Sequence, residues 1–308
     1  MVKKNNIAFF TVIYNQNAKF TNDFLISLNN QTYKDFDLFI VNDNVKDLLT
    51  VIKKYPNLNP IIFNLSGTPT EIRLAGLKKL TKLSYKYIIF GDCDDYFKPN
   101  RIEFLCNNFN DEFDLLVHDV SLVDSNSKVI QNNFFYPRIN HNQHISINDI
   151  LTYNFLGLTN TAISHSVLKK LTLVNVNVIA LDWYLFSQAL LLNIKTKFLK
   201  NNLTYYRQHE RSLVGYNKNH PQIIETGVKV KCLHYDQMSK INPILYRDLK
   251  ENFKELNQLY SSSKKFIKLY LIRIEKLLYD DKENDELCLI NYFWWENIKS
   301  VKELNINQ

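Results

Sequence analysis

The stretch KYIIFGDCDDYFKPNR, Lys86 to Arg101, decides the fold because an apolar run in it ends in three closely spaced carboxylates. The residues YIIF precede a glycine, and Asp92, Asp94 and Asp95 follow within four positions. Short, continuous apolar runs are typical of strands that are buried on both faces of a sheet. We therefore predict a buried strand over Lys86–Asp92 with acids at its carboxyl end. In extended backbone, Asp92 and Asp94 would project to the same side until the chain turns near Asp95.

Other apolar runs extend this pattern to an alternating α/β fold. The predicted strands are Ile7–Tyr14, Asp37–Asp43, Pro60–Leu65 and Asp114–Val120. A helix after the first strand has an apolar face of Phe20, Phe24, Leu25 and Leu28, and a helix before Lys86 has one of Ile72, Ala75, Leu77 and Leu80. This order predicts an α/β sheet flanked by helices.

Composition and charge exclude several classes of protein. With 308 residues, of which 45% are hydrophobic and 13% aromatic, the chain can bury a large core. Its formal charge of +7 is spread without a long basic block, so we expect no nucleic-acid partner. The four cysteines show no spacing of a metal site or disulfide framework. The sequence has no signal peptide and no apolar stretch of about 20 residues, so we expect a cytoplasmic protein, soluble or peripheral to a membrane.

Polar residues lie where the predicted strands end. Ligands of open α/β sheets bind at the carboxyl ends of strands, and Thr11, Tyr14 and Asp43 join the three acids there. Neighbouring carboxylates raise each other's pKa unless a cation lies between them. Mg²⁺ or Mn²⁺, which prefer oxygen ligands, would relieve this repulsion. A simpler alternative is that the acids cap the helix that begins near Pro99 or pair with surface lysines.

Five blocks, in order and spacing, resemble the family 2 glycosyltransferases over roughly Asn6–Gly215. They are FFTVIYNQ, LFIVNDN, YIIFGDCDDYFKPNRIE, ALDWYLF and, more weakly, YYRQHERS. The resemblance implies the GT-A fold, a Rossmann-like mixed sheet flanked by helices with a mainly helical C-terminal extension. It also implies metal-dependent transfer of a sugar from a nucleotide diphosphate donor with inversion. The Gln-x-x-Arg-Trp signature of processive synthases is missing, which favours transfer of a single sugar.

The resemblance assigns donor-binding roles to residues at the strand ends. Thr11 and Tyr14 would hold the nucleobase, and Asp43 would accept its imide hydrogen, which favours uridine. Arg73, in EIRLAG, resembles an arginine near the diphosphate and ribose, although Leu74 stands where the family usually has asparagine.

The acids after Ile89 resemble the DxD motif of the family. Asp94 would bind the metal, while Asp92 and Asp95 would contact ribose or sugar hydroxyls. His209 resembles a histidine that returns to the metal or the diphosphate.

Three further assignments concern the second half of the chain. Arg207 and Arg211 would meet phosphate oxygens. Asp182, in LDWYLF, resembles the general base that deprotonates the acceptor hydroxyl, although the family often has glutamate where Leu181 stands. Asp182 could also cap a helix over Trp183–Leu192, a position that favours the ionised carboxylate.

The chain is predicted to hold a GT-A domain over residues 1–220, with a donor half of about 1–120 and an acceptor half of about 121–220. A helical region follows over 221–308. Within it, Ser261–Asp281 has the pattern of a basic amphipathic helix. Such a helix either packs on its own domain or lies in an anionic membrane interface.

The predicted function is transfer of glucose or another hexose from a UDP donor. The acceptor would be a glycan or a polyprenyl-diphosphate-linked oligosaccharide in bacterial glycan assembly, at the cytoplasmic face of the membrane. Small branching glucosyltransferases that act on such lipids are similar. Two alternatives stay open: a sugar nucleotidyltransferase, although YNQNAKF lacks its glycine-rich phosphate loop, and a non-catalytic carbohydrate- or membrane-binding protein, although Asp43, Asp94 and Asp182 are present.

Overall fold

The computed structural model describes residues 5–15, 18–139, 144–209, 221–280, 295 and 297–306. The chain divides into two compact units. The first unit contains Met1–Asp149, Leu156–Asn175 and Gln188–Gln208, and the second contains Ile150–Phe155, Val176–Ser187 and His209–Gln308. Two short segments from the middle of the chain thus belong with the C-terminal helices. The boundary near residue 220 stays a prediction.

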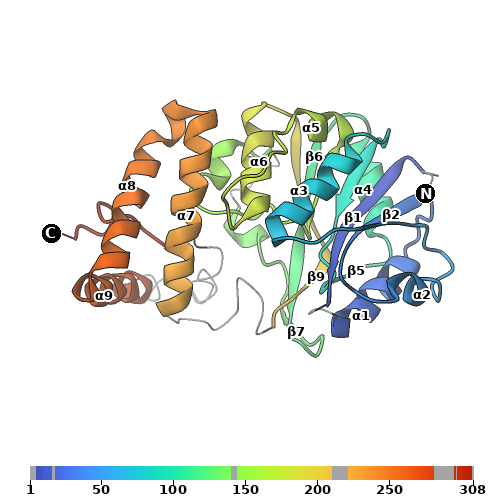
Figure 1. Ribbon diagram of the computed structural model, residues 1–308, viewed down its shortest axis with the longest axis horizontal. Coiled ribbons are helices and arrows are strands. Elements are labelled where there is room, and N and C mark those ends of the chain that lie inside the picture. Colours follow the sequence, from blue (N-terminus) through green and yellow to red (C-terminus); the bar gives the residue numbers. More distant parts are fainter. Residues whose placement is uncertain are drawn as a thin grey trace. The chain divides into compact units, whose positions relative to one another are not determined.

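Within the described residues, the first unit contains a nine-stranded mixed sheet (Figure 1). Its strand order is β3-β2-β1-β4-β8-β6-β9-β5, and β7 pairs with β6. The strands are β1 (Ile7–Tyr14), β2 (Phe36–Asp43), β3 (Pro60–Asn64), β4 (Tyr87–Phe90), β5 (Tyr96–Phe97), β6 (Leu115–Val123), β7 (Val129–Gln131), β8 (Thr161–Ser164) and β9 (Thr196–Arg207).

Strands β3, β2, β1 and β4 are parallel neighbours, whereas β8 is antiparallel to both β4 and β6. The helices that accompany this sheet are α1 (Ala18–Asn29), α2 (Leu48–Ile52), α3 (Pro69–Leu80), α4 (Arg101–Phe109) and α5 (His165–Lys170). The prediction of an α/β sheet flanked by helices is confirmed.

Alternate residues of β1 bring helices to both faces of the sheet. Phe9 packs edge-on against Phe24 of α1, with ring centroids 6.0 Å apart. Phe10 points to the other face, where it lies against Gly76 of α3. A Cβ atom at Gly76 would come within 2.9 Å of the Phe10 ring and 2.5 Å of the Val41 side chain. A glycine is therefore required where α3 crosses β1 and β2.

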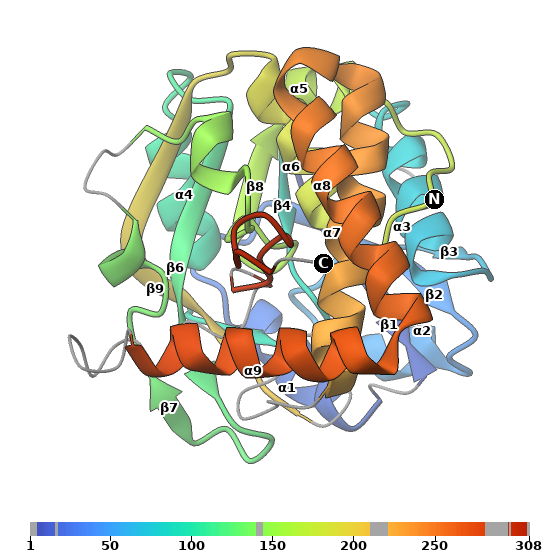
Figure 2. The same ribbon diagram turned by 90° about the vertical axis from the view of Figure 1, so that its left-hand side faces the viewer.

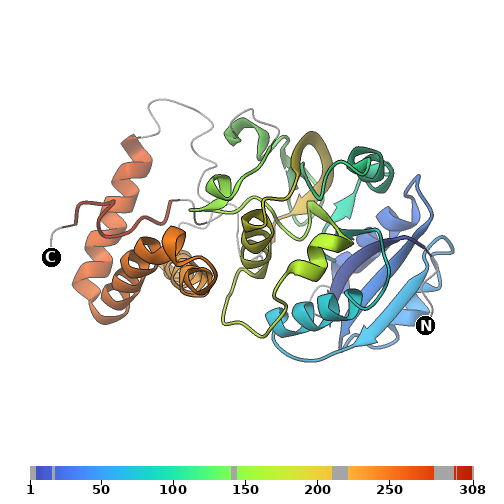
Figure 3. The ribbon, with the colours of Figure 1, turned by 90° about the horizontal axis from the view of Figure 1, so that it is seen from above.

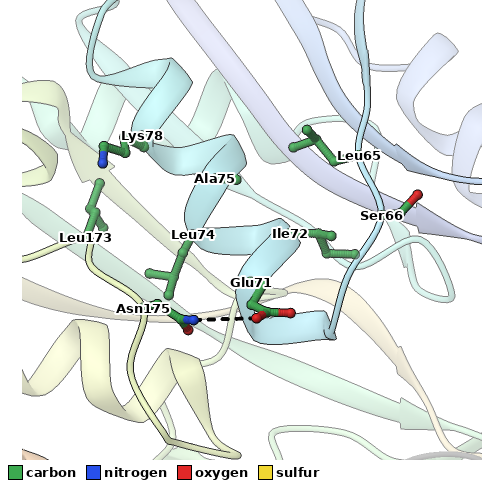
Figure 4. A pocket seen from close by; sticks show the side chains of 9 residues that line it. All are labelled: Leu65, Ser66, Glu71, Ile72, Leu74, Ala75, Lys78, Leu173 and Asn175. Atoms are coloured by element: carbon green, nitrogen blue, oxygen red, sulfur yellow. Dashed lines mark hydrogen bonds between the residues drawn. The ribbon is translucent and has the colours of Figure 1, made fainter.

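The predicted buried face of α3 is wrong at one position. Ile72, Leu77 and Leu80 are buried as expected, but Leu74 is buried and Ala75 is half-exposed. Leu74 points to the side of the helix on which Leu173 and Asn175 lie, and all three line one cavity (Figure 4). A segment distant in sequence therefore covers a residue that helical periodicity alone assigns to the surface.

The strand that carries the acids is shorter than predicted. β4 ends at Phe90, and the chain turns at Cys93 and Asp94. The backbone N–H of Asp95 donates to the carbonyl of Asp92 at 3.3 Å. The expected extended backbone up to Asp94 is wrong, because the turn that was expected near Asp95 already forms at Cys93 and Asp94.

The second unit is built around paired helices. Its helices are α7 (Pro221–Ile241), α8 (Pro243–Ser262) and α9 (Lys264–Asp280), together with the first part of α6 (Leu181–Leu191). α7 and α8 lie side by side (Figure 3), and α9 runs crosswise to them (Figure 2). No helix in the described part of the chain is long and apolar enough to cross a bilayer.

An aromatic core joins α6 to α7 in this unit. The Trp183 ring stacks on His234, with centroids 3.9 Å apart and planes at 13°. Trp183 Nε1 donates to the carbonyl of Ile150 at 2.7 Å. Neither ring nitrogen of His234 has a hydrogen-bond partner among the described residues. Burial, with a smaller effect of Lys231, lowers the pKa of His234 to about 3.

We predict that His234 makes the protein less stable as the pH falls. An unfolded histidine binds a proton below about pH 6.5, whereas the folded state excludes this proton until about pH 3. The contribution of neutral His234 to the free energy of unfolding is therefore fully present above pH 6.5. It decreases as the pH falls toward 3, by up to about 1.4 kcal/mol per pH unit for one histidine. Urea unfolding between pH 7.5 and 4.5 measures the slope. His234→Phe keeps the stack on Trp183 and should reduce the slope of stability against pH.

His118 of the first unit is also buried, and its pKa is lowered by burial and by Arg101. It contributes equally to wild type and variant, so the difference between their slopes isolates His234. Identical slopes would contradict the assignment.

Candidate active site

The acidic turn between β4 and β5 is the centre of the candidate site. Asp92 and Asp94 are half-buried, whereas Asp95 is only 1% exposed. The turn begins at Gly91, where a Cβ atom would clash with the rings of Phe9 and Phe97. Tight packing beneath the turn therefore requires glycine and fixes where the acids emerge.

Arg73 reaches the turn from α3. A capping box of Thr68 and Glu71 starts this helix. One turn later, Arg73 Nη2 lies 2.9 Å from Asp92 Oδ1 in a partly exposed ion pair. Burial raises the pKa of Asp92, and the charge of Asp94 raises it further, while Arg73 opposes both effects. The two carboxylates are thus close enough to repel each other.

Asp95 points into the protein. Its carboxylate accepts hydrogen bonds from the Thr159 hydroxyl and from the backbone N–H of Arg207, the latter at 2.7 Å. Burial raises its pKa well above the ordinary value, and the charges of Asp94 and Asp92 add to the effect. This placement favours a supporting role for Asp95 over the predicted contact with donor hydroxyls.

Arg101 lies beneath the turn, a role that sequence reasoning missed. Its side chain is fully buried, and its Nη2 donates to the carbonyls of Phe90 at 2.6 Å and Thr159 at 2.9 Å. Its Nε lies 3.0 Å from His118 Nε2. Burial lowers the pKa of Arg101 to about 9, and the charge of Asp95 opposes this shift. The signal available in the sequence was an arginine on the apolar side of a helix.

Arg207, at the end of β9, holds the turn from the side. It is 2% exposed, and its Nε donates to the carbonyl of Asp94 at 2.8 Å. Nη1 donates to Ser127 Oγ at 3.0 Å and to the carbonyl of Ser125 at 3.2 Å, while Nη2 pairs with Asp23 at 2.8 Å. These bonds hold the turn, and the predicted phosphate contact of Arg207 stays a prediction.

The predicted nucleobase residues lie together on the neighbouring strands. Tyr14 and Asp43 are paired in register at the ends of β1 and β2, and the Arg73 guanidinium lies 5.6 Å from the centre of the Tyr14 ring. Burial raises the pKa of Tyr14 to about 12, so its hydroxyl stays protonated. Thr11 Oγ1 and the Tyr14 hydroxyl are buried without a hydrogen-bond partner among the described residues. Unpaired buried polar atoms are rare and are consistent with a site that takes a ligand or ordered water.

Asp182 and His209 belong to the second unit. Asp182 lies in the first turn of α6, and its Oδ1 accepts the backbone N–H of Trp183 at 2.8 Å. The positive end of the helix dipole favours an ionised carboxylate there. His209 is half-buried, and Arg211 lies outside the described residues.

The acidic turn suits a metal ion that the donor helps to hold. Among the described residues, no group of three or more His, Cys, Asp or Glu side chains is arranged to bind a metal. Mg²⁺ in nucleotide sites is commonly bound by one or two carboxylates together with substrate phosphates. Asp92 and Asp94 meet that requirement, and a cation would offset the burial and the charge of Asp94, which both raise the pKa of Asp92.

Two cavities in the first unit differ in their relation to this turn. One, of about 400 Å³, lies along α3 and is lined by Leu74, Lys78 and Asn175 among others (Figure 4). None of the three acids lines it. The other, of about 360 Å³, is polar and lies beside the turn, since Arg207 forms part of its wall with Lys19 and Asn126.

Comparisons with known proteins agree with this arrangement. The model of glycosyl transferase family 2 matches residues 9–172, just over half of the chain. An uncharacterized glycosyltransferase of Methanocaldococcus jannaschii is 32% identical over 123 residues, which are 38% of this chain and 42% of the relative. The match thus spans about two-fifths of that relative.

Two solved structures have the same fold. TarS of S. aureus, in complex with UDP-GlcNAc, has a TM-score of 0.57 and 21% identity, over 84% of this chain and 74% of that chain. The mannosyltransferase PcManGT of Pyrobaculum calidifontis, in complex with GDP-Man and Mn²⁺, has a TM-score of 0.54 and 10% identity, over 94% and 85%. These likenesses confirm the predicted GT-A fold.

We predict that Arg207 stabilises the turn while its partner Asp23 contributes little. Arg207→Met leaves the carbonyl of the half-buried Asp94 without this donor, and a lost bond at a buried group costs about 1–3 kcal/mol, whereas the carbonyl of the exposed Ser125 can bind water instead. We therefore expect a loss of about 1–3 kcal/mol in the free energy of unfolding. Asp23 is 47% exposed, so Asp23→Asn should cost no more than about 1 kcal/mol. Equal losses in urea unfolding would show that the exposed ion pair, and not the carbonyl contacts, carries the effect.

Proposed function

This chain belongs to glycosyl transferase family 2, and we propose that it transfers one sugar from a UDP-sugar donor to an acceptor hydroxyl with inversion. The observation that carries the proposal is the acidic turn at the carboxyl end of β4, beside Tyr14 and Asp43 on the neighbouring strands. Open α/β sheets bind ligands at this edge.

The donor would lie across the ends of β1, β2 and β4. We assign Thr11 and Tyr14 to the nucleobase, where their unpaired hydroxyls support a ligand contact. Asp43 would accept the imide N–H of uracil, a donor that cytosine lacks. Arg73, which already faces both Tyr14 and Asp92, would neutralise part of the diphosphate charge. The complex of TarS with UDP-GlcNAc supports a UDP donor.

We assign Asp94 as the protein ligand of Mn²⁺ or Mg²⁺, with Asp92 beside it and His209 as a second candidate ligand. The bound ion would supply charge stabilisation for the departing diphosphate. Arg101 and Arg207 would act through the turn, because they fix the backbone that carries Asp94. The Mn²⁺ in PcManGT supports a divalent ion in this fold.

The acceptor side of the reaction needs a base. We propose that Asp182 takes the proton of the acceptor hydroxyl as its oxygen attacks the anomeric carbon. The bond between that carbon and the UDP oxygen breaks at the same time, and UDP leaves with the electron pair. Asp182 lies at a helix N-terminus, which favours its ionised form and therefore its action as a base.

We propose a hexose, such as glucose, as the transferred sugar and a glycan or polyprenyl-diphosphate-linked oligosaccharide as the acceptor, at the cytoplasmic face of a bacterial membrane. Release of UDP or GDP from UDP-glucose, UDP-galactose, UDP-GlcNAc and GDP-mannose tests the donor. Release from a UDP-sugar alone is the expected result. Failure of every donor, despite binding of UDP, would favour a non-catalytic carbohydrate-binding protein.

Removal of the metal should weaken the nucleotide only when Asp94 is present. We expect wild-type protein to bind UDP at least about tenfold more tightly with Mn²⁺ than in chelator, which corresponds to about 1.4 kcal/mol. Asp94→Asn should abolish this difference, since it removes the proposed ligand charge. Isothermal titration calorimetry measures both affinities. Asp35→Asn, at an exposed position, is the matched control and should retain the full metal effect.

Replacement of Asp182 should separate catalysis from folding. Asp182→Asn keeps the size and most hydrogen bonding but removes the proton acceptor, so transfer should fall by about 10²- to 10⁴-fold. UDP affinity and the free energy of unfolding should barely change. A role limited to capping predicts instead that Asp182→Ala lowers the free energy of unfolding by about 0.5–2 kcal/mol and that Asp182→Asn lowers it little. Both variants would then transfer sugar at the normal rate. Initial rates, affinity and urea unfolding on one preparation distinguish the two roles.

A further inference from the structure

The outward face of α9 combines positive charge with exposed aliphatic side chains. Leu269 is 39% exposed and Ile272 is 53% exposed. The exposed cations of the same helix are Lys264, Lys265, Lys268, Arg273 and Lys276, and among residues 264–276, whose side chains the structure describes, Glu275 is the one exposed acid. Within the described part of the chain, no ion pair joins any of these five cations to an acid. We call this surface the α9 face.

The α9 face is not needed for packing of the helix on its own unit. Tyr270 and Ile274, on the opposite side of the helix, are buried. Tyr270 stacks on Phe266, and its hydroxyl donates to the carbonyl of Lys299 at 2.7 Å. Since a helix places residues three and four apart on one side, the buried pair fixes the orientation of α9. The helix therefore packs on its unit and still presents a basic face.

We propose that the α9 face docks on a membrane surface that contains anionic lipids, with the helix parallel to the bilayer. The cations complement the charge of the headgroups. Around a helix of 3.6 residues per turn, Lys265 lies about 20° and Lys276 about 40° from Ile272, so Ile272 is flanked by positive charge. When the cations contact the headgroups, Leu269 and Ile272 meet the boundary with the acyl chains.

The aliphatic side chains distinguish a membrane from nucleic acid. Phosphates of a duplex are met by cations and polar donors, which would leave Leu269 and Ile272 against a charged backbone without apolar contact. A bilayer interface accommodates both kinds of side chain. The 17 residues of α9 span about 26 Å at 1.5 Å per residue, which gives the helix a long line of contact with the surface.

Vesicle sedimentation with the full chain tests this inference. The experiment needs no sugar donor, so its result does not depend on the proposed transferase activity. Wild-type protein should bind vesicles of phosphatidylcholine with phosphatidylglycerol and should not bind phosphatidylcholine alone. The triple variant Lys265→Gln, Lys268→Gln, Lys276→Gln should lose on the order of 10² in partition coefficient, or about fivefold per charge. The matched control is Lys53→Gln, Lys54→Gln, Lys82→Gln, three exposed lysines of the first unit, and it should bind like wild type.

A second variant tests the aliphatic contact separately. Leu269→Ser with Ile272→Ser alters only exposed positions of a helix that is held by its other side, so it should fold normally. Its binding should be more sensitive to salt than that of wild type, because only the electrostatic attraction remains. Equal loss in the two lysine variants, or binding to a DNA duplex without binding to anionic vesicles, would overturn the proposal. So would wild-type binding that is independent of the anionic lipid.

Discussion

The candidate site depends on the pairing of three aspartates with three arginines. Asp92, Asp94 and Asp95 occupy one turn, and such a concentration of negative charge is unfavourable in a partly buried setting. Arg73 pairs with Asp92, Arg207 binds the Asp94 carbonyl and donates its backbone N–H to Asp95, and Arg101 lies beneath. The arginines come from α3, β9 and α4 respectively. The sheet and its helices therefore have to assemble before the turn acquires its shape.

The three acids differ in exposure, and they therefore differ in which groups they can contact. Asp95 is enclosed by hydrogen-bond donors and holds the turn, whereas Asp92 and Asp94 remain partly accessible. Burial raises the pKa of Asp92 and the charge of Asp94 adds to the rise, while Arg73, whose effect is larger than that of Asp94, lowers this pKa without cancelling the effect of burial. A site that keeps unfavourable charge in the absence of ligand can bind a cation and a diphosphate together more strongly than either alone. The burial of these acids thus costs stability, and the proposed binding of a cation with the donor would offset part of that cost.

The second unit contains Asp182, the proposed base, next to an apolar core. Trp183 is anchored by the Ile150 carbonyl and by the stack on His234, and Asp182 precedes it at the helix N-terminus. This packing buries the imidazole of His234, whose two ring nitrogens have no hydrogen-bond partner among the described residues. Only its neutral form is compatible with burial, so the packing that orders α6 is also a source of acid sensitivity. The basic α9 face lies on the same unit and is independent of this core.

The sequence by itself determined the alternating strands, the helices and the position of the acids at a strand end. These features follow from apolar periodicity and from local composition, which act over a few residues. The sequence did not determine that Arg101 and Arg207 are buried supports, or that the segment of Leu173 covers Leu74. Each of these depends on a partner distant in sequence, such as Thr159 for Arg101 or Asp23 for Arg207. Only the tertiary structure decides such contacts, because a charged side chain is stable in the interior only where separate segments bring it several acceptors at once.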